Sequence, residues 1–189
     1  MKAIKQNGRY CLEEKQSLSR VKQHSEKGFV MMSAFRGDDE KKNKENHKKL
    51  LADLKSAKLG YFVVDGVYKY DDGTIGKELS VFVAWNKEKY SNFTDMLRVM
   101  KKLGKKYNQE SILIKYPHDS DKEGAAVLYY PVEHKEEIIG KKVGLDKISF
   151  AYSKLRKASH KARSFVIEGT EEPQNHIDAM GFNKRGQLF

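Results

Sequence analysis

The stretch YFVVDGVYKYDDGTIGKELSVFVAW, residues 61–85, decides the fold. Two runs rich in β-branched and aromatic residues flank the turn-forming segment DDGTIG, which is the pattern of a β-hairpin. In the second run Glu78, Ser80 and Phe82 point one way, and the residues between them point the other way. The sequence therefore predicts an antiparallel strand pair in which two polar side chains share a face.

A helix is predicted before this hairpin, over residues 40–59. Asn43, His47, Leu50 and Leu54 recur at spacings of four, three and four, so they share one face of the helix. The amino-terminal half of this inward face carries an amide and an imidazole. Both need partners, because an unpaired buried polar group costs ~1–3 kcal/mol.

A second helix ends in the segment KYNQESIL, residues 106–113. Asn108 suits the left-handed conformation that terminates helices. Gln109 and Ser111 then enter a strand with the same side-chain direction. If this strand adjoins the hairpin, polar side chains from both would meet Asn43. They would form either a structural network or a pocket for a nucleotide or a nucleic-acid end.

The remaining elements point to one α+β domain. The runs FVMMSAF, SILIKYP, AAVLYYP and SFVIEG are typical strands, whereas residues 132–147 lack periodicity and are expected to be mostly loop. We expect a mixed, mostly antiparallel sheet of about five to six strands with helices packed on one face. Residues 1–27 are expected to form an N-terminal helical segment, residues 28–169 the core domain, and residues 170–189 a C-terminal tail.

The chain is basic. It carries 37 Lys and Arg against 26 Asp and Glu, a net charge of +11 and a pI near 9.5, which attracts polyanions. The candidate nucleic-acid-binding residues lie in one short segment: Lys154, Arg156, Lys157, Lys161 and Arg163. A solvated basic face is the alternative interpretation.

Several protein classes are disfavoured by what the sequence lacks. No apolar run approaches the ~20 residues that span a bilayer, and the N-terminus has no apolar signal core. Cys11 is the single cysteine, so no internal disulfide forms, which fits a reducing compartment. Glycine-rich phosphate loops, HExxH, paired CxxC and Gly-x-Ser-x-Gly motifs are absent. No metal and no cofactor are expected.

The order of several motifs resembles a known family. The motifs are MSAFR, NKENHKKLLADLKSAKLGY, DGVY, KELSVFVAW, KYNQESILIK, FAYSKLR and SFVIEG, and the resemblance covers about residues 29–168. In this order they resemble an uncharacterised bacteriophage protein family, which also occurs inside large multidomain phage proteins. They resemble bacterial domains of unknown function more distantly. The resemblance implies phage origin rather than a mechanism. The matching positions are Ser33, Arg36, Asn43, Asn46, Glu78, Ser80, Tyr107, Asn108, Gln109, Ser111, Tyr152 and Arg156.

The preferred hypothesis is a phage-type accessory protein, active in host takeover or defence evasion. It would bind nucleic acid or a nucleotide-like anion without covalent chemistry, or alternatively a phage or host protein, and no membrane. We expect it in the host-cell cytoplasm, with the virion as the alternative; the oligomeric state is not predicted. The candidate ligand-binding residues are Arg36, Asn43, Glu78, Ser80, Asn108, Gln109 and Ser111.

Two other functions are kept as alternatives. The first is a structural or assembly component of the virion, which needs surfaces rather than a site. The second is an enzyme acting on a nucleotide or nucleic acid. In that case Glu78 would be the general acid or base, Arg36 would clamp an anion, and Asn43 and Gln109 would orient the substrate. The sequence favours a protein that is not an enzyme.

Overall fold

The computed structural model describes residues 3–6, 9–12, 18–37, 39–69, 75–145, 151–155 and 164–168. The helices are α1 (Leu18–Lys27), α2 (Glu40–Ser56) and α3 (Phe93–Lys106). A small hairpin is formed by β1 (Ala3–Gln6) and β2 (Arg9–Leu12). The remaining strands are β3 (Phe29–Ser33), β4 (Tyr61–Lys69), β5 (Ile75–Ala84), β6 (Ile112–Lys115), β7 (Ala126–Tyr130), β8 (Lys135–Gly140), β9 (Lys142–Leu145), β10 (Ala151–Leu155) and β11 (Ser164–Glu168).

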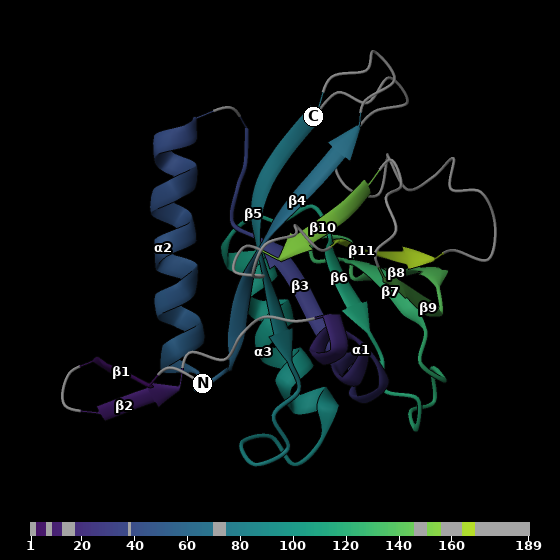
Figure 1. Ribbon diagram of the computed structural model, residues 1–189. Helices are drawn as coiled ribbons and strands as arrows, with labels where there is room; N and C mark the ends of the chain where they lie inside the picture. The colour runs from purple at the N-terminus through teal and green to yellow at the C-terminus, as the bar shows by residue number, and fades with distance from the viewer. Residues whose placement is uncertain are drawn as a thin grey trace.

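One large sheet organises the described residues. Its strand order is β8-β7-β6-β3-β5-β4-β10-β11-β9, and every neighbouring pair is antiparallel (Figure 1). The expected α+β architecture is confirmed, and the residue 61–85 hairpin forms β4 and β5 as predicted. The sheet is wider than expected, with nine strands among the described residues.

Residues 132–147 account for part of the extra width. They were expected to be mostly loop, but they contain β8 and β9. β8 reads KEEIIG and is an edge strand, so it pairs on one side with β7 only. Ile138 on this strand is exposed. Because edge strands commonly carry charge, and Ile139 is the buried hydrophobic residue of this strand, β8 leaves little hydrophobic pattern in the sequence.

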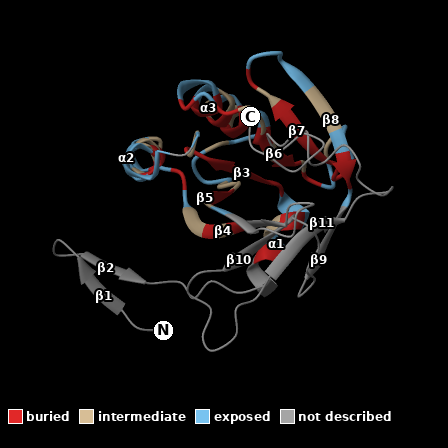
Figure 2. Cartoon of the chain, turned by 90° about the horizontal axis from the view of Figure 1, so that it is seen from above, coloured by how far each residue is buried: buried red, intermediate tan, exposed pale blue. Residues whose placement is uncertain are grey.

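Two helices cover one face of the sheet, which we call the helix-pair face. Leu50 on α2 and Met96 on α3 are fully buried against Val30 on β3. The inward stripe predicted for α2 is confirmed, since Asn43, His47, Leu50 and Leu54 are its buried residues. Figure 2, seen from above, shows α2 and α3 on the same side of β3, β5 and β6. The helix-pair face therefore holds the larger core.

The opposite face, which we call the α1 face, carries the third helix. Val21 of α1 packs with Phe29 and Phe82. The rings of Phe29 and Phe82 stack at 4.3 Å between centroids, and those of Phe62 and Phe82 at 4.5 Å. The helices thus cover both faces of the sheet rather than the single face expected (Figure 2).

The first half of the KYNQESIL segment forms the C-terminal end of α3. Asn108 has a φ of 51°, in the left-handed region. Its N–H donates to Lys105 O at 3.0 Å, and the Gln109 N–H donates to Gly104 O at 2.9 Å. This pair of hydrogen bonds is a Schellman motif, which satisfies the last carbonyl groups of a helix. It is the helix-ending role expected for Asn108.

The ends of the chain remain partly outside this description. Residues 3–12 contain the β1–β2 hairpin, and α1 follows at residue 18, within the segment expected to be helical. The expected tail, residues 170–189, lies outside the described residues. The domain boundaries at residues 27 and 169 stay predictions. Across the described ranges, no helix is long and apolar enough to cross a membrane.

Candidate functional site

A row of serine residues lies at one end of the sheet, on β3, on β5 and at the residue that precedes β6. Ser33 on β3 lies opposite Ser80 on β5, and both side chains are buried. On the other side of β3, Met31 pairs with Leu113 of β6. Continuing that antiparallel register by two residues places Ser111 beside Ser33. We call Ser111, Ser33 and Ser80 the serine row.

The serine row lies on the α1 face. Side chains alternate along a strand, so Ser33 faces the same way as Met31, and Ser80 the same way as Phe82. Both of those neighbours belong to the core cluster under α1. The row therefore continues the α1 face beyond its apolar part. It lies on the opposite side of the sheet from α2 and α3.

Hydrogen bonds fix the hydroxyl groups of the row. The Ser33 hydroxyl donates to Leu79 O at 2.9 Å and accepts from the Phe35 N–H at 3.0 Å. The Ser80 hydroxyl donates to Glu78 Oε1 at 3.1 Å. Glu78 is half-buried and shares the direction of Ser80, so a carboxylate lies at one end of the row.

Tyr130 lies at the other end of the row. Ile112 pairs with Tyr129, so the next position in the register places Tyr130 beside Ser111. The Tyr130 hydroxyl donates to Glu137 Oε2 at 3.0 Å. Burial raises the pKa of Tyr130 above its ordinary value, and the Glu137 carboxylate raises it further. Tyr130 thus stays protonated and acts as a donor.

Two buried amides hold the loop that follows β3. Asn43 Oδ1 accepts from the Arg36 N–H at 2.6 Å, and Asn43 Nδ2 donates to Gly37 O at 2.9 Å. Gln109 Nε2 donates to Phe35 O at 3.3 Å. Asn43 and Gln109 are only 4% and 6% exposed. We call this pair the amide clamp, because it fixes residues 35–37 from two different helix ends.

An ion pair lies at the rim beside the clamp. Arg36 Nη1 is 3.4 Å from Glu110 Oε2, and the side chains are 36% and 29% exposed, respectively. Glu110 stands between Gln109 of the clamp and Ser111 of the row. The Arg36–Glu110 ion pair is therefore partly accessible to solvent.

The structure divides the predicted ligand-binding residues into two groups. Glu78 and Ser80 are joined by a hydrogen bond on the α1 face, with Ser111 two strands away, whereas Asn43 and Gln109 both donate to the backbone of the β3–α2 loop that carries Arg36. The predicted convergence of Glu78 with Asn43 and Gln109 stays a prediction. Asn108 serves the helix end described above.

Most of the predicted nucleic-acid-binding residues lie outside the residues that the structure describes. Lys154 lies in β10, opposite Asp65 of β4, with its side chain outside the described part. Arg156, Lys157, Lys161 and Arg163 lie outside the described residues. Two residues that the predicted site omitted now join it, Ser33 and Glu110. From the sequence, Ser33 is named only as a position that matches the resembled family, and not as a ligand-binding residue.

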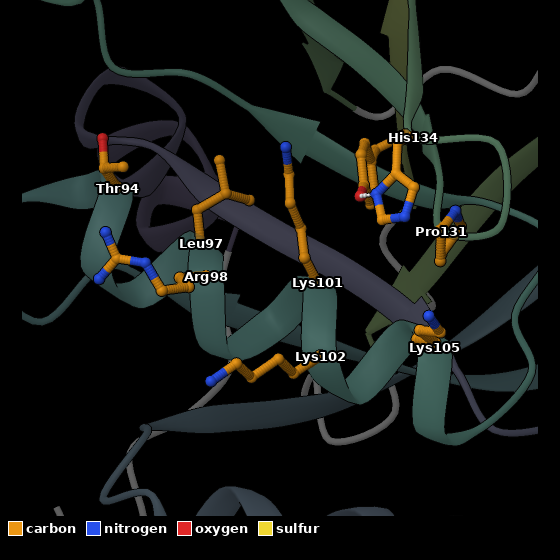
Figure 3. Close-up of a pocket in the computed structure, with 9 residues that line it drawn as sticks. Thr94, Leu97, Arg98, Lys101, Lys102, Lys105, Pro131 and His134 are labelled. Atoms are coloured by element: carbon orange, nitrogen blue, oxygen red, sulfur yellow. Dashed lines mark hydrogen bonds between the residues drawn. The ribbon is translucent and has the colours of Figure 1, made fainter.

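A separate groove of about 330 Å³ runs between α3 and the β7–β8 turn (Figure 3). Lys101 Nζ lies 3.9 Å from the centroid of the Tyr129 ring and 3.0 Å from Glu136 Oε1. The Tyr129 hydroxyl and His134 Nδ1 are 2.9 Å apart. The lining residues are Thr94, Leu97, Arg98, Lys101, Lys102, Lys105, Tyr129, Pro131 and His134. With four cationic side chains, this groove favours anions and disfavours cations.

No metal centre accompanies either region in the part of the chain that is described. There, no group of three or more His, Cys, Asp and Glu side chains is placed to hold a metal ion.

Comparison with known proteins gives the class. The chain belongs to a family of lyases, enzymes that break a bond without hydrolysis or oxidation. It is the S-Adenosylmethionine lyase family, whose family model matches residues 30–188 and so includes the serine row and Glu78. Among solved structures, the chain is similar to a phage SAM lyase in complex with S-methyl-5'-thioadenosine. The identity is 14% and the TM-score 0.29, over 77% of this chain and 91% of that chain. No curated protein sequence matches.

Family membership corrects the functional expectations. The preferred hypothesis, a non-enzymatic accessory protein that binds nucleic acid or a nucleotide-like anion, is wrong, and so is the alternative of a virion component. The expected partners, nucleic acid and a phage or host protein, are replaced by a small-molecule substrate. The expectation of an uncharacterised family is also corrected, because the family is that of the S-Adenosylmethionine lyases. The error arose because net charge describes a whole surface, not a site.

Proposed function

We propose that this protein cleaves S-adenosylmethionine, and that the serine row with Glu78 forms its active site. The observation that carries the proposal is the family match over residues 30–188, which contains these polar residues. Their geometry adds support, since Ser80 holds a half-buried carboxylate in place at 3.1 Å. A fixed carboxylate beside buried hydroxyl groups is suited to a cationic substrate that also carries hydroxyl groups.

The chemistry of the substrate limits what the site must do. S-Adenosylmethionine carries a positively charged sulfonium sulfur bonded to three carbon atoms. When one carbon–sulfur bond breaks, its electron pair stays on sulfur, which becomes a neutral thioether. The carbon then either bonds to an oxygen of the substrate's own carboxylate or forms a double bond as the neighbouring carbon loses a proton. The leaving group is therefore already activated, and the enzyme needs no metal ion or acid to expel it. Positioning of the reacting atoms supplies the larger part of the rate.

Glu78 has a role that follows from this charge balance. The positive charge on sulfur disappears as the bond breaks, so a carboxylate placed against sulfur stabilises the substrate more than the transition state. We therefore assign Glu78 to binding and orienting a cationic part of the substrate and to accepting a proton where the reaction releases one. Ser80 keeps that carboxylate in one orientation, and Ser33 fixes the strand end next to it.

The basic groove beside α3 is the weaker candidate for this substrate. Arg98, Lys101, Lys102 and Lys105 line it. Like charges close together repel, so these side chains raise the free energy of a bound sulfonium. The α1 face offers a carboxylate instead. Electrostatics therefore favours the serine row over the groove.

The test is direct turnover. Purified protein is incubated with S-adenosylmethionine in ¹⁸O-labelled water, and substrate and products are followed by mass spectrometry. The proposal predicts enzyme-dependent loss of the sulfonium compound, a neutral thioether product, and no ¹⁸O in the products at early times. Loss of substrate no faster than in buffer alone would contradict it, and ¹⁸O in the first product would indicate a hydrolase instead.

A further inference from the structure

We infer that Arg36 and Glu110 bind the amino-acid end of the substrate. Arg36 binds the carboxylate of the substrate, and Glu110 binds its ammonium group. This inference rests on the proposed function, because it names how the same site recognises one end of S-adenosylmethionine. It concerns a part of the molecule that the serine row and Glu78 leave unassigned.

The pair lies where such an end would reach. Arg36 follows Ser33 by three residues, and Glu110 directly precedes Ser111, so the backbone of both charged residues lies at the end of the sheet that carries the row. The pKa of Tyr130 is raised mainly by burial and next by the Glu137 carboxylate. The Glu110 carboxylate raises the pKa of Tyr130 further. The negative field of Glu110 therefore extends to the Tyr130 end of the row.

The backbone under the pair is fixed before any ligand binds. The Arg36 N–H donates to Asn43, and the carbonyl of the preceding Phe35 accepts from Gln109. Glu110 follows Gln109, whose own N–H closes the Schellman motif of α3. Both amides of the clamp are almost fully buried. Preorganised backbone reduces the ordering that binding would otherwise require.

The geometry of the pair matches a zwitterion. The Arg36–Glu110 contact is single and long, at 3.4 Å, and both side chains are partly exposed. An exposed pair of this kind contributes little to stability. An α-amino acid presents a carboxylate and an ammonium group on one carbon. Arginine binds a carboxylate through two parallel hydrogen bonds, which are stronger than the single contact that it makes here.

Binding of two ligands that differ in the amino-acid end tests this inference. S-Adenosylhomocysteine and S-methyl-5'-thioadenosine are both neutral at sulfur and both carry adenosine, but only the first has the amino-acid end. Their dissociation constants are measured by titration calorimetry for the parent protein, Arg36→Gln and Glu110→Gln. Arg98→Gln is the matched control, since Arg98 also pairs with a carboxylate, that of Asp95, on α3.

The inference predicts that each substitution raises the dissociation constant of S-adenosylhomocysteine about tenfold, because one charge-assisted contact is lost. The dissociation constant of S-methyl-5'-thioadenosine should change less than about twofold. Arg98→Gln should change neither constant. An equal loss of affinity for both ligands, or no loss of affinity for either, would overturn the inference and leave the proposed function standing. A parent protein that binds neither ligand would overturn both. Melting curves of the variants identify any that fail to fold, and for these Arg36→Lys and Glu110→Asp are measured instead, with the same predicted selectivity for S-adenosylhomocysteine.

Discussion

Ser80 donates its hydroxyl hydrogen to Glu78 at 3.1 Å while lying directly opposite Ser33 across the β3–β5 ladder. The carboxylate is thus oriented by a side chain whose own position is set by strand register. This relationship connects the fold of the sheet with the proposed chemistry on its α1 face.

Ser80→Ala should lower kcat/KM for S-adenosylmethionine roughly tenfold, because one hydrogen bond to a charged group is lost. The variant should remain folded, since alanine fits the same buried position. Steady-state kinetics and a melting curve check this. Ser120→Ala is the control, because it removes a serine hydroxyl that donates to Pro117 O in a loop away from the row. Unchanged kinetics in Ser80→Ala would show that Glu78 needs no such support.

Asn43→Ala should lower the free energy of unfolding by about 1–3 kcal/mol, since the buried amide loses two hydrogen bonds to the backbone of the β3–α2 loop. The affected groups are the Arg36 N–H and the Gly37 carbonyl. Urea denaturation measures the loss. Lys48→Ala on the exposed side of α2 is the control and should change stability by less than about 0.5 kcal/mol. A similar loss in both variants would argue against the amide clamp.

The sequence predicted the helical part of this arrangement well. The spacing of Asn43, His47, Leu50 and Leu54 determines which side of α2 is buried, because 3.6 residues per turn relates spacing to direction. The amide at Asn43 could therefore be expected to find partners. Its actual partners, at the end of β3, depend on how the chain turns after that strand and are not encoded in any local pattern.

The serine row could not be predicted in the same way. Within β5 the shared direction of Glu78 and Ser80 follows from alternation alone. The placement of β3 between β5 and β6 does not, because it joins strands far apart in the sequence. Only that placement puts Ser33 between Ser80 and Ser111. The expected meeting of Glu78 with Asn43 stays a prediction, because it depends on how the loop after β3 packs against the end of β5.

Asn108→Gly should leave the free energy of unfolding unchanged or slightly higher, whereas Asn108→Ala should lower it by about 1 kcal/mol. The reason is the φ of 51°, which glycine adopts freely and alanine only under strain. Thermal and urea denaturation of the two variants check the order. Equal stability of the glycine and alanine variants would contradict a strained helix end at this position.

Lys115 gives stability a dependence on pH. The side chain is 1% exposed, donates to the carbonyl of Gly124, and burial lowers its pKa below the ordinary value of 10.5. Between the lowered pKa and 10.5, the unfolded chain binds more protons than the folded protein, so stability rises with pH there. The parent should therefore gain stability relative to Lys115→Met as the pH approaches 10.5. Parallel unfolding curves of the two proteins across this range would contradict the prediction.

Turnover of S-adenosylmethionine by Glu78→Gln tests the central claim most directly, because the substitution removes the charge and keeps the shape. Glu45→Gln, an exposed position on α2, is the control. With both variants melting like the parent, kcat/KM should fall roughly 100-fold in Glu78→Gln and stay within twofold in Glu45→Gln. Parental activity in a folded Glu78→Gln protein would contradict the placement of the active site on the serine row.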